Sequence, residues 1–218
     1  MRETHYILLV MKGLGSTRSL LVPDRFHQFI FKEEDVMKMT SDKLAKMAMM
    51  VALSIVLVMI IHIPIFPAVP FLEYDPADVP ILIGSFAFGP VAGIILTVAT
   101  SLIQGLTVSA GSGPYGIIMH IIATATLVLV SGIIYSKEKT KKRAVIALVC
   151  GTIAMTLIMI PANMLVTPYF TGWPLDAVMP LMPWIVLFNL VKAGINSLVT
   201  FLVYKKISPI LHRSKVNA

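Results

Sequence analysis

The run VPILIGSFAFGPVAGIILTVATSLIQGL, residues 79–106, decides the fold because it is compatible with two topologies. The run is largely apolar and is interrupted by the helix-breaking pair Gly89-Pro90. As one helix, its 28 residues would be about 42 Å long, too long for a hydrocarbon core of about 30 Å without strong tilt. Gly-Pro also ends one helix and starts the next. The run is therefore either one kinked membrane span or a hairpin of two short spans.

The composition of the whole chain indicates a membrane protein. Of its 218 residues, 57% are hydrophobic and only 13% are charged, and the mean hydropathy is +0.86. Soluble domains carry about 25% charged residues, so a soluble protein of this composition could not cover its own surface. The net charge of +7 could suggest nucleic acid. The basic residues, however, form short clusters beside apolar runs, as membrane-flanking charges do. We therefore expect contact with membrane lipid and no nucleic-acid partner.

Charge counting decides between the two topologies. The other apolar runs are residues 44–63, 117–135, 144–166 and 184–204. The loops without Lys or Arg are residues 64–75, 107–114 and 167–183. If Gly89-Pro90 forms a hairpin, these three loops share one side, and every basic cluster lies on the other, which the positive-inside rule makes cytoplasmic. The prediction is an all-α integral membrane protein, a six-transmembrane-helix bundle with both termini cytoplasmic.

The chain divides into three parts. Residues 1–39 mix charges with scattered aromatic residues and lack the apolar core and cleavage site of a secretory signal. We interpret them as an N-terminal extension that is poorly ordered or an over-extended start, and assign them no function. Residues 40–212 form the membrane domain, and residues 213–218 form a basic tail.

Lys192 is the most informative residue. It is the ninth residue of the last apolar run, roughly 13 Å from the outer end of that helix at 1.5 Å per residue. A charge at this depth is costly unless it has a partner or a water-filled cavity. Asn189 and Asn196 lie on the same helix face. The asparagines alone could serve as hydrogen-bonding residues between helices, but with Lys192 the stripe favours a polar ligand or ion site.

Further polar residues lie near the predicted outer surface. Asn163 follows Pro161 near the outer end of the fifth span, and two carboxamides together suit a heteroaromatic ligand with alternating C=O and N–H groups. Glu73, Asp75 and Asp78 crowd the outer mouth, where one could pair with Lys192. Their alternative is solvated loop charge with an N-cap at Asp78. No metal-ligand cluster appears, and the isolated His62 and His120 are interpreted as structural or interfacial.

The first span carries Ala45, Ala48 and Ala52 at helical spacing. The small-xxx-small pattern of Ala48 and Ala52 allows another helix to approach closely, either within the bundle or from another subunit. No phosphate loop, H-E-x-x-H or G-x-S-x-G motif and no intramembrane pair of carboxylates is present, so no enzymatic activity is predicted. A membrane enzyme acting on lipid would need acids or histidines at the cytoplasmic face, and the visible acids lie outside.

Three segments carry a resemblance to a known family: Glu73-Tyr-Asp-Pro-Ala-Asp-Val-Pro-Ile-Leu-Ile-Gly, Phe88-Gly-Pro-Val-Ala-Gly, and Phe188-Asn-Leu-Val-Lys-Ala-Gly. With them, residues 40–212 resemble the substrate-binding S components of energy-coupling factor (ECF) vitamin transporters, most closely the riboflavin-specific group. The Asn and Lys three residues apart are moderately specific for that group. The Gly-Pro motif is shared among S components and leaves another vitamin or precursor open.

The resemblance implies a multi-pass protein of a prokaryotic cell membrane that captures riboflavin at the outer face and delivers it inward by reorienting. It implies a transmembrane coupling subunit and two ATPase subunits as partners, with Ala45, Ala48 and Ala52 facing the coupling subunit. It implies ligand contacts by Asn189, Lys192 and Asn163, with Glu73 and Asp78 as further candidates. Riboflavin would be the transported ligand, and no cofactor is expected.

Overall fold

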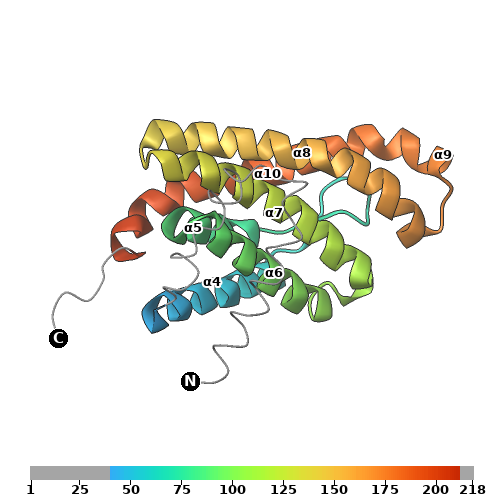
Figure 1. The fold of residues 1–218 in the computed structure, drawn as a ribbon. Coiled ribbons are helices and arrows are strands. Elements are labelled where there is room, and N and C mark those ends of the chain that lie inside the picture. The colour runs from blue at the N-terminus through green and yellow to red at the C-terminus, as the bar shows by residue number, and fades with distance from the viewer. Residues whose placement is uncertain (1–39, 212–218) are drawn as a thin grey trace, which may run out of the picture. The chain divides into compact units, whose positions relative to one another are not determined.

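The computed structural model describes residues 40–211. The expected extension at residues 1–39 and the basic tail at residues 213–218 lie outside the described residues. The described part is a bundle of long helices with one small strand pair (Figure 1). Its longer helices are α4 (Ser41–Ile60), α5 (Asp78–Phe88), α6 (Pro90–Leu106), α7 (Gly113–Lys137), α8 (Lys141–Thr171) and α10 (Met182–Leu211). The short elements are β1 (Ile63–Pro64), β2 (Glu73–Tyr74), α9 (Leu175–Val178) and the 3₁₀ turns Ala110–Ser112 and Met179–Leu181.

Gly89-Pro90 forms the hairpin that charge counting predicts. Gly89 has φ of 97°, a conformation that favours glycine, and Pro90 begins α6 at the position where proline is best tolerated. The two helices then fold back on each other. A side chain at Gly93 would collide with Ser85, and one at Gly84 would collide with Leu96. These small residues let α5 and α6 pack closely, which confirms a six-helix bundle.

The two helices of the hairpin are shorter than α4, α7, α8 and α10. Within residues 40–211, four helical segments, containing α4, α7, α8 and α10, are long and apolar enough to cross a membrane, whereas α5 has 11 residues and α6 has 17. At 1.5 Å per residue, α5 covers only about 16 Å of a hydrocarbon core of about 30 Å. Residues 61–77 connect the end of α4 to the start of α5. They form an antiparallel strand pair and turns that cover this end of the bundle. We call this segment the 61–77 loop.

Several helix ends differ from the ends of the predicted spans, and three of the differences bear on the site. The first helix ends at Ile60 and not at residue 63, because Ile63 and Pro64 pair with Tyr74 and Glu73. The fifth span continues through Pro161 and Pro168 to Thr171, where Gly172 at φ 71° ends it. The last helix begins at Met182, and α9 and a 3₁₀ turn occupy the segment before it, where only a loop was expected.

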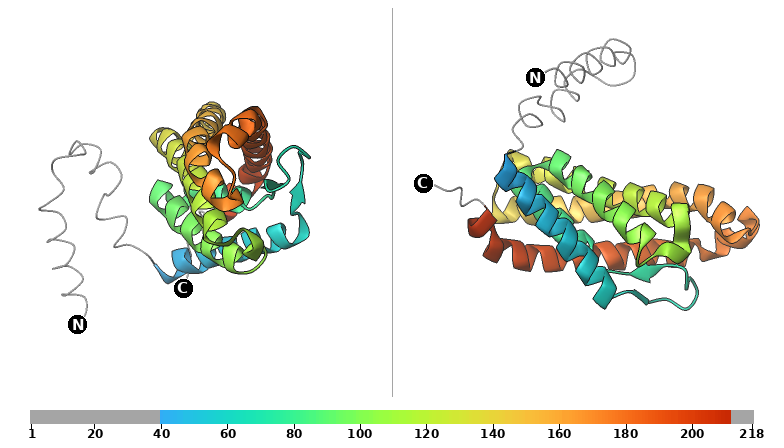
Figure 2. Two further views of the ribbon diagram at one scale, coloured as in Figure 1. Left: turned by 90° about the vertical axis from the view of Figure 1, so that its right-hand side faces the viewer. Right: turned by 90° about the horizontal axis from the view of Figure 1, so that it is seen from below.

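The helices run antiparallel to their chain neighbours, so the connections form two groups (Figure 2). The Gly89-Pro90 turn, the basic connection between α7 and α8, and the last described turn of α10 lie at one end. The 61–77 loop, the turn after α6 and the α8–α9 connection lie at the other.

Buried polar residues lie inside the bundle beside its apolar core, and large apolar residues cover its outside. Thr97, Ser101, Thr152 and Asn196 are buried, whereas α8 exposes an apolar stripe. That stripe is Val145, Val149, Ile153 and Leu157. Such an arrangement suits a lipid environment, where apolar side chains face outward and polar groups satisfy one another within the bundle.

Candidate ligand-binding site

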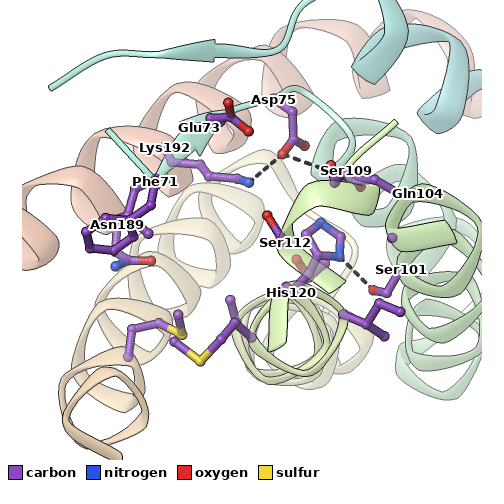
Figure 3. A pocket seen from close by; sticks show the side chains of 18 of the residues that line it. Phe71, Glu73, Asp75, Ser101, Gln104, Ser109, Ser112, His120, Asn189 and Lys192 are labelled. Atoms are coloured by element: carbon purple, nitrogen blue, oxygen red, sulfur yellow. Dashed lines mark hydrogen bonds and ion pairs between the residues drawn. The ribbon is translucent and has the colours of Figure 1, made fainter. Parts of the chain in front are cut away.

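A cavity of about 130 Å³ lies under the 61–77 loop. Its lining comes from that loop and from α6, α7, α8 and α10. Figure 3 shows two polar walls that face each other across it, one on α10 and the other on α6, α7 and the turn between them.

The α10 wall carries Asn189 and Lys192, and both side chains are buried. Asn189 Nδ2 donates to the Ile185 carbonyl on its own helix at 2.8 Å. This bond turns the amide oxygen of Asn189 toward the cavity (Figure 3). Lys192 Nζ donates to Asp75 Oδ2 at 2.8 Å, and both side chains are nearly inaccessible to solvent. Among the three acids predicted as candidate partners of Lys192, the structure therefore selects Asp75.

A hydrogen-bond network below the cavity holds the acids in place. Asn196 Nδ2 donates to the Asp75 carbonyl at 3.1 Å and to Asp78 Oδ2 at 2.9 Å. Asp78 Oδ1 accepts from Thr124 Oγ1 at 2.6 Å, with His120 Nε2 at 3.7 Å. Asp78 is completely buried, so these donors replace the water that a carboxylate would otherwise need. The network ties the 61–77 loop and α5 to α7 and α10.

Two loop residues have shifted pKa values. Burial alone would raise the pKa of Asp75, but the Lys192 ammonium and the Ala77 N–H lower it below its ordinary value. Asp75 is therefore ionised at neutral pH. Burial, with the nearby Asp75 charge, raises the pKa of the Tyr74 hydroxyl. Tyr74 thus stays protonated and donates to Asn196 Oδ1 at 3.1 Å.

The opposite wall consists of neutral polar groups. Gln104 on α6 is buried, and its Nε2 donates to Asp75 Oδ2 at 3.5 Å and to Ser109 Oγ at 3.3 Å. His120 on α7 lies 2.6 Å from Ser101 Oγ through Nδ1. Ser112 completes this wall (Figure 3).

Apolar side chains line the cavity between the two polar walls. Phe71 comes from the 61–77 loop, Met155 and Met159 from α8, and Phe188 from α10. Aromatic contacts hold the loop against the helices. Phe66 packs on Phe188 with ring centroids 6.5 Å apart. This combination of apolar surface and a few directed polar groups is typical of small-molecule sites.

The predicted ligand residues occupy two kinds of position. Asn189, Lys192 and Glu73 line the cavity, and Glu73 also contacts His62 at 2.8 Å. Asp78 lies behind the lining in the network described above. Asn163 is also behind the lining, with both ends of its amide bonded within α8, to the Met159 carbonyl and to Thr167 Oγ1. Within residues 40–211, no three His, Cys, Asp or Glu side chains group as metal ligands.

Sequence reasoning missed Ser101 and Gln104. A signal was available, because Thr97, Ser101 and Gln104 recur at spacings of four and three in an otherwise apolar run. That spacing places them on one helix face, and all three are buried. The same reasoning that singled out the α10 stripe would have found this one.

The surroundings of the predicted partner-interface residues are apolar and differ from the two polar walls of the cavity. Ala45, Ala48 and Ala52 are all exposed on α4. Ala48 and Ala52 line a wide apolar groove whose other side is Ile95, Ala99 and Ile103 of α6.

Comparisons with known proteins agree with this architecture. Residues 42–204 match the family model described as ECF transporter, substrate-specific component. The chain is 31% identical over 184 residues to a Staphylococcus aureus protein named riboflavin transporter RibU, covering 78% of this chain and 93% of that protein. It is 28% identical over 184 residues to the Bacillus subtilis riboflavin transporter FmnP, covering 79% and 95% of the two chains.

A solved structure of the S component of a bacterial ECF transporter superposes with a TM-score of 0.69. It is 32% identical in sequence, and the match covers 78% of this chain and 98% of that one. The family match spans most of the chain, including every helix that contributes to the cavity. This chain therefore belongs to the family of substrate-specific components of ECF transporters.

Proposed function

We propose that this chain is the riboflavin-binding component of an ECF-type vitamin importer, and that riboflavin binds in the cavity under the 61–77 loop. The family works with a transmembrane coupling subunit and ATPases, so the chain itself needs no catalytic residues. Two relatives of this chain are named riboflavin transporters.

The observation that carries the proposal is the pair Asn189 and Lys192 on one cavity wall. One edge of the flavin ring presents C=O, N–H and C=O, and a carboxamide with an ammonium can pair with such an edge. The flat ring face needs apolar contacts, which Phe71, Phe188 and the two methionines offer. Burial of Lys192 is then explained by ligand binding as well as by its ion pair.

The size of the cavity indicates how binding proceeds. Sites for ligands of this size have volumes of about 300–1,000 Å³, whereas the cavity measures about 130 Å³. We infer that riboflavin enters when the 61–77 loop moves outward. Because Asp75 belongs to that loop, this motion also separates Asp75 from Lys192, and the freed ammonium can donate to the ligand.

The remaining predicted contacts stay part of the proposal. Glu73 lies at the cavity lining, where it can accept from the ligand. Asn163 and Asp78 would reach riboflavin only after the residues in front of them move. An Asn163→Leu variant tests this directly, since a contact predicts weaker riboflavin binding and a purely internal role predicts lower thermal stability alone.

The orientation in the membrane and the partner surface are also proposed. The end of the bundle with the basic α7–α8 connection would be cytoplasmic, which places both termini inside and the cavity outside. In a Cys150→Ala background, a membrane-impermeant thiol reagent should label Thr107→Cys but not Lys139→Cys in intact cells. Labelling of Lys139→Cys alone would reverse the orientation. Ala45, Ala48 and Ala52 would contact the coupling subunit, because small side chains let helices approach closely.

Purification in mild detergent tests the function. We expect flavin absorbance in the purified protein, and saturable quenching of riboflavin fluorescence once the bound flavin is removed. Thiamine and biotin should not compete. Absence of riboflavin binding, with saturable binding of another vitamin, would contradict the proposal.

A further inference from the structure

The end of α8 and the short helix α9 extend past α6 and α7 at the cavity end of the bundle (Figures 1 and 2). Helix α8 has 31 residues, which span about 46 Å at 1.5 Å per residue. Even at a tilt of about 20° this helix covers about 44 Å, against about 30 Å of hydrocarbon. If the basic residues 141–143 mark one membrane surface, the hydrocarbon ends near residue 163, about 20 residues further on. Residues 165–184, here called the α9 tip, therefore lie beyond the opposite edge of the hydrocarbon.

The α9 tip exposes apolar and aromatic side chains where a loop in water would be polar. Tyr169 is 77% exposed and Leu165 is 68% exposed, and Asp176 is the only charged residue of this stretch. The other large apolar side chains exposed here are Trp173, Leu175, Met179 and Trp184. Residues 137–143 at the other end of the bundle differ, since they are Lys, Arg, Glu and Thr. Exposed apolar patches mark surfaces that contact a membrane or another protein.

The backbone of the α9 tip does not suit the hydrocarbon itself. The chain reverses through residues 172–174 outside any helix, with Gly172 at φ 71°. Irregular backbone does not occur exposed to lipid within the hydrocarbon, because its N–H and C=O groups would lack partners. The tip therefore carries side chains unsuited to water on a backbone unsuited to hydrocarbon. The headgroup region satisfies both requirements, because it is hydrated but partly apolar, and Trp and Tyr are enriched there.

We propose that the α9 tip anchors the cavity end of the bundle in the membrane interface, with phospholipid as its partner. Tyr169 and the two tryptophans each combine an apolar ring with an O–H or N–H group, which suits the boundary between headgroups and acyl chains. The tip has no basic residue to attract anionic headgroups, so it should bind neutral phospholipid. Trp184 also packs on Phe66 with ring centroids 6.0 Å apart, so the anchored surface adjoins the 61–77 loop. The inference is independent of which ligand the cavity binds.

Tryptophan fluorescence tests the anchor directly, because the chain has two tryptophans, Trp173 and Trp184, and both lie in the α9 tip. Flavin-free wild-type protein is reconstituted in phosphatidylcholine vesicles whose acyl chains carry bromine, either near the headgroup or near the bilayer centre. Bromine quenches tryptophan fluorescence on contact. Quenching by the shallow bromines should exceed quenching by the deep bromines at least about twofold, since interfacial side chains reach only the headgroup boundary. Iodide in the water should quench less than the shallow bromines do.

Ile153→Trp, in a background with Trp173→Phe and Trp184→Phe, is the matched control for depth. Ile153 is exposed on α8 and lies about 15 Å from residue 143, near the centre of the hydrocarbon, so the deep bromines should quench this variant more. Stronger quenching of the native tryptophans by the deep bromines would overturn the inference. Iodide quenching without bromine quenching would place the tip in water and would also overturn it. Protection from both quenchers would overturn it in favour of a protein partner, such as a second copy of this chain.

Discussion

Helices α4 and α10 are both apolar, yet each carries one stripe that differs from the rest of its surface. On α10 the stripe is Asn189, Lys192 and Asn196, and it is buried. On α4 the stripe is Ala45, Ala48 and Ala52, and it is exposed. A buried polar stripe in a membrane bundle must be paired internally or with a ligand. An exposed small-residue stripe has nothing to satisfy and offers only a close approach. Under the proposed function, ligand binding and docking to the coupling subunit would therefore lie on different helices.

The largest effect is expected on riboflavin uptake, from substitutions in the alanine stripe of α4. Replacing Ala48 and Ala52 together with Trp should abolish riboflavin uptake in cells, because the bulky rings would block close approach of the coupling subunit. The riboflavin dissociation constant of the purified variant should stay unchanged. Leu157→Trp, on the exposed apolar face of α8, is the control and should transport normally. Normal uptake by the double variant would place the docking surface elsewhere.

The polar stripe of α10 contains two asparagines, Asn189 and Asn196, whose roles can be separated by substitution. Asn189→Leu should raise the riboflavin dissociation constant roughly tenfold to 150-fold, because a buried polar group of the ligand would lose its partner, at about 1.5–3 kcal/mol. The thermal unfolding midpoint should change little.

Asn196→Leu should do the reverse. It removes bonds to Asp75, Asp78 and Tyr74 within the protein. The expected result is a clear fall in the unfolding midpoint and a smaller change in affinity. Equal effects of both variants on affinity would show that the stripe acts as one ligand site.

A smaller effect is expected from the counterion of Lys192. Asp75→Asn removes the carboxylate that competes with the ligand for the ammonium. Riboflavin should therefore bind more tightly, by up to about tenfold or about 1.4 kcal/mol. The protein alone should be less stable, because a buried charge loses its partner. Weaker binding in this variant would mean that Asp75 contacts riboflavin or orders the site.

The smallest effect concerns pH. The folded pKa of Asp75 lies below the unfolded value of 3.8, so its ion pair contributes full stability above that value. The contribution is lost only as pH falls through the lower folded pKa. The difference in unfolding midpoint between wild type and Asp75→Asn should thus be constant from pH 5 to 8, and shrink below pH 4. A difference that shrinks between pH 5 and 7 would contradict this assignment.

The helical topology was predictable because the distribution of charged residues between the loops indicates which loops share a side of the membrane. Gly89-Pro90 alone permits a kink or a hairpin, and the distribution of Lys and Arg between loops selects the hairpin. The 61–77 loop was not predictable. Its strands have two residues each, too few to show a pattern, and their pairing depends on the helices beneath them.

The candidate site was partly predictable for a related reason. Lys192 was predictable as a site residue because a charge at its depth in the membrane is costly without a partner or a ligand. Its partner could be narrowed to three acids but not chosen, since the choice depends on the loop conformation. Gln104 was not predicted because a neutral amide in an apolar helix is a weaker signal than a charge. Gln104 and Lys192 are nevertheless both buried at the same cavity.

In the proposed function, Lys192 is buried at this depth because it binds riboflavin. Lys192→Met tests it most directly, because methionine keeps much of the volume and removes the charge and its donors. Riboflavin should be titrated against the purified variant by fluorescence quenching, with the unfolding midpoint measured on the same sample. The dissociation constant should rise roughly tenfold to 150-fold in a protein that remains folded. An unchanged dissociation constant with a lowered unfolding midpoint would contradict it, and would make Lys192 a structural partner of Asp75 alone.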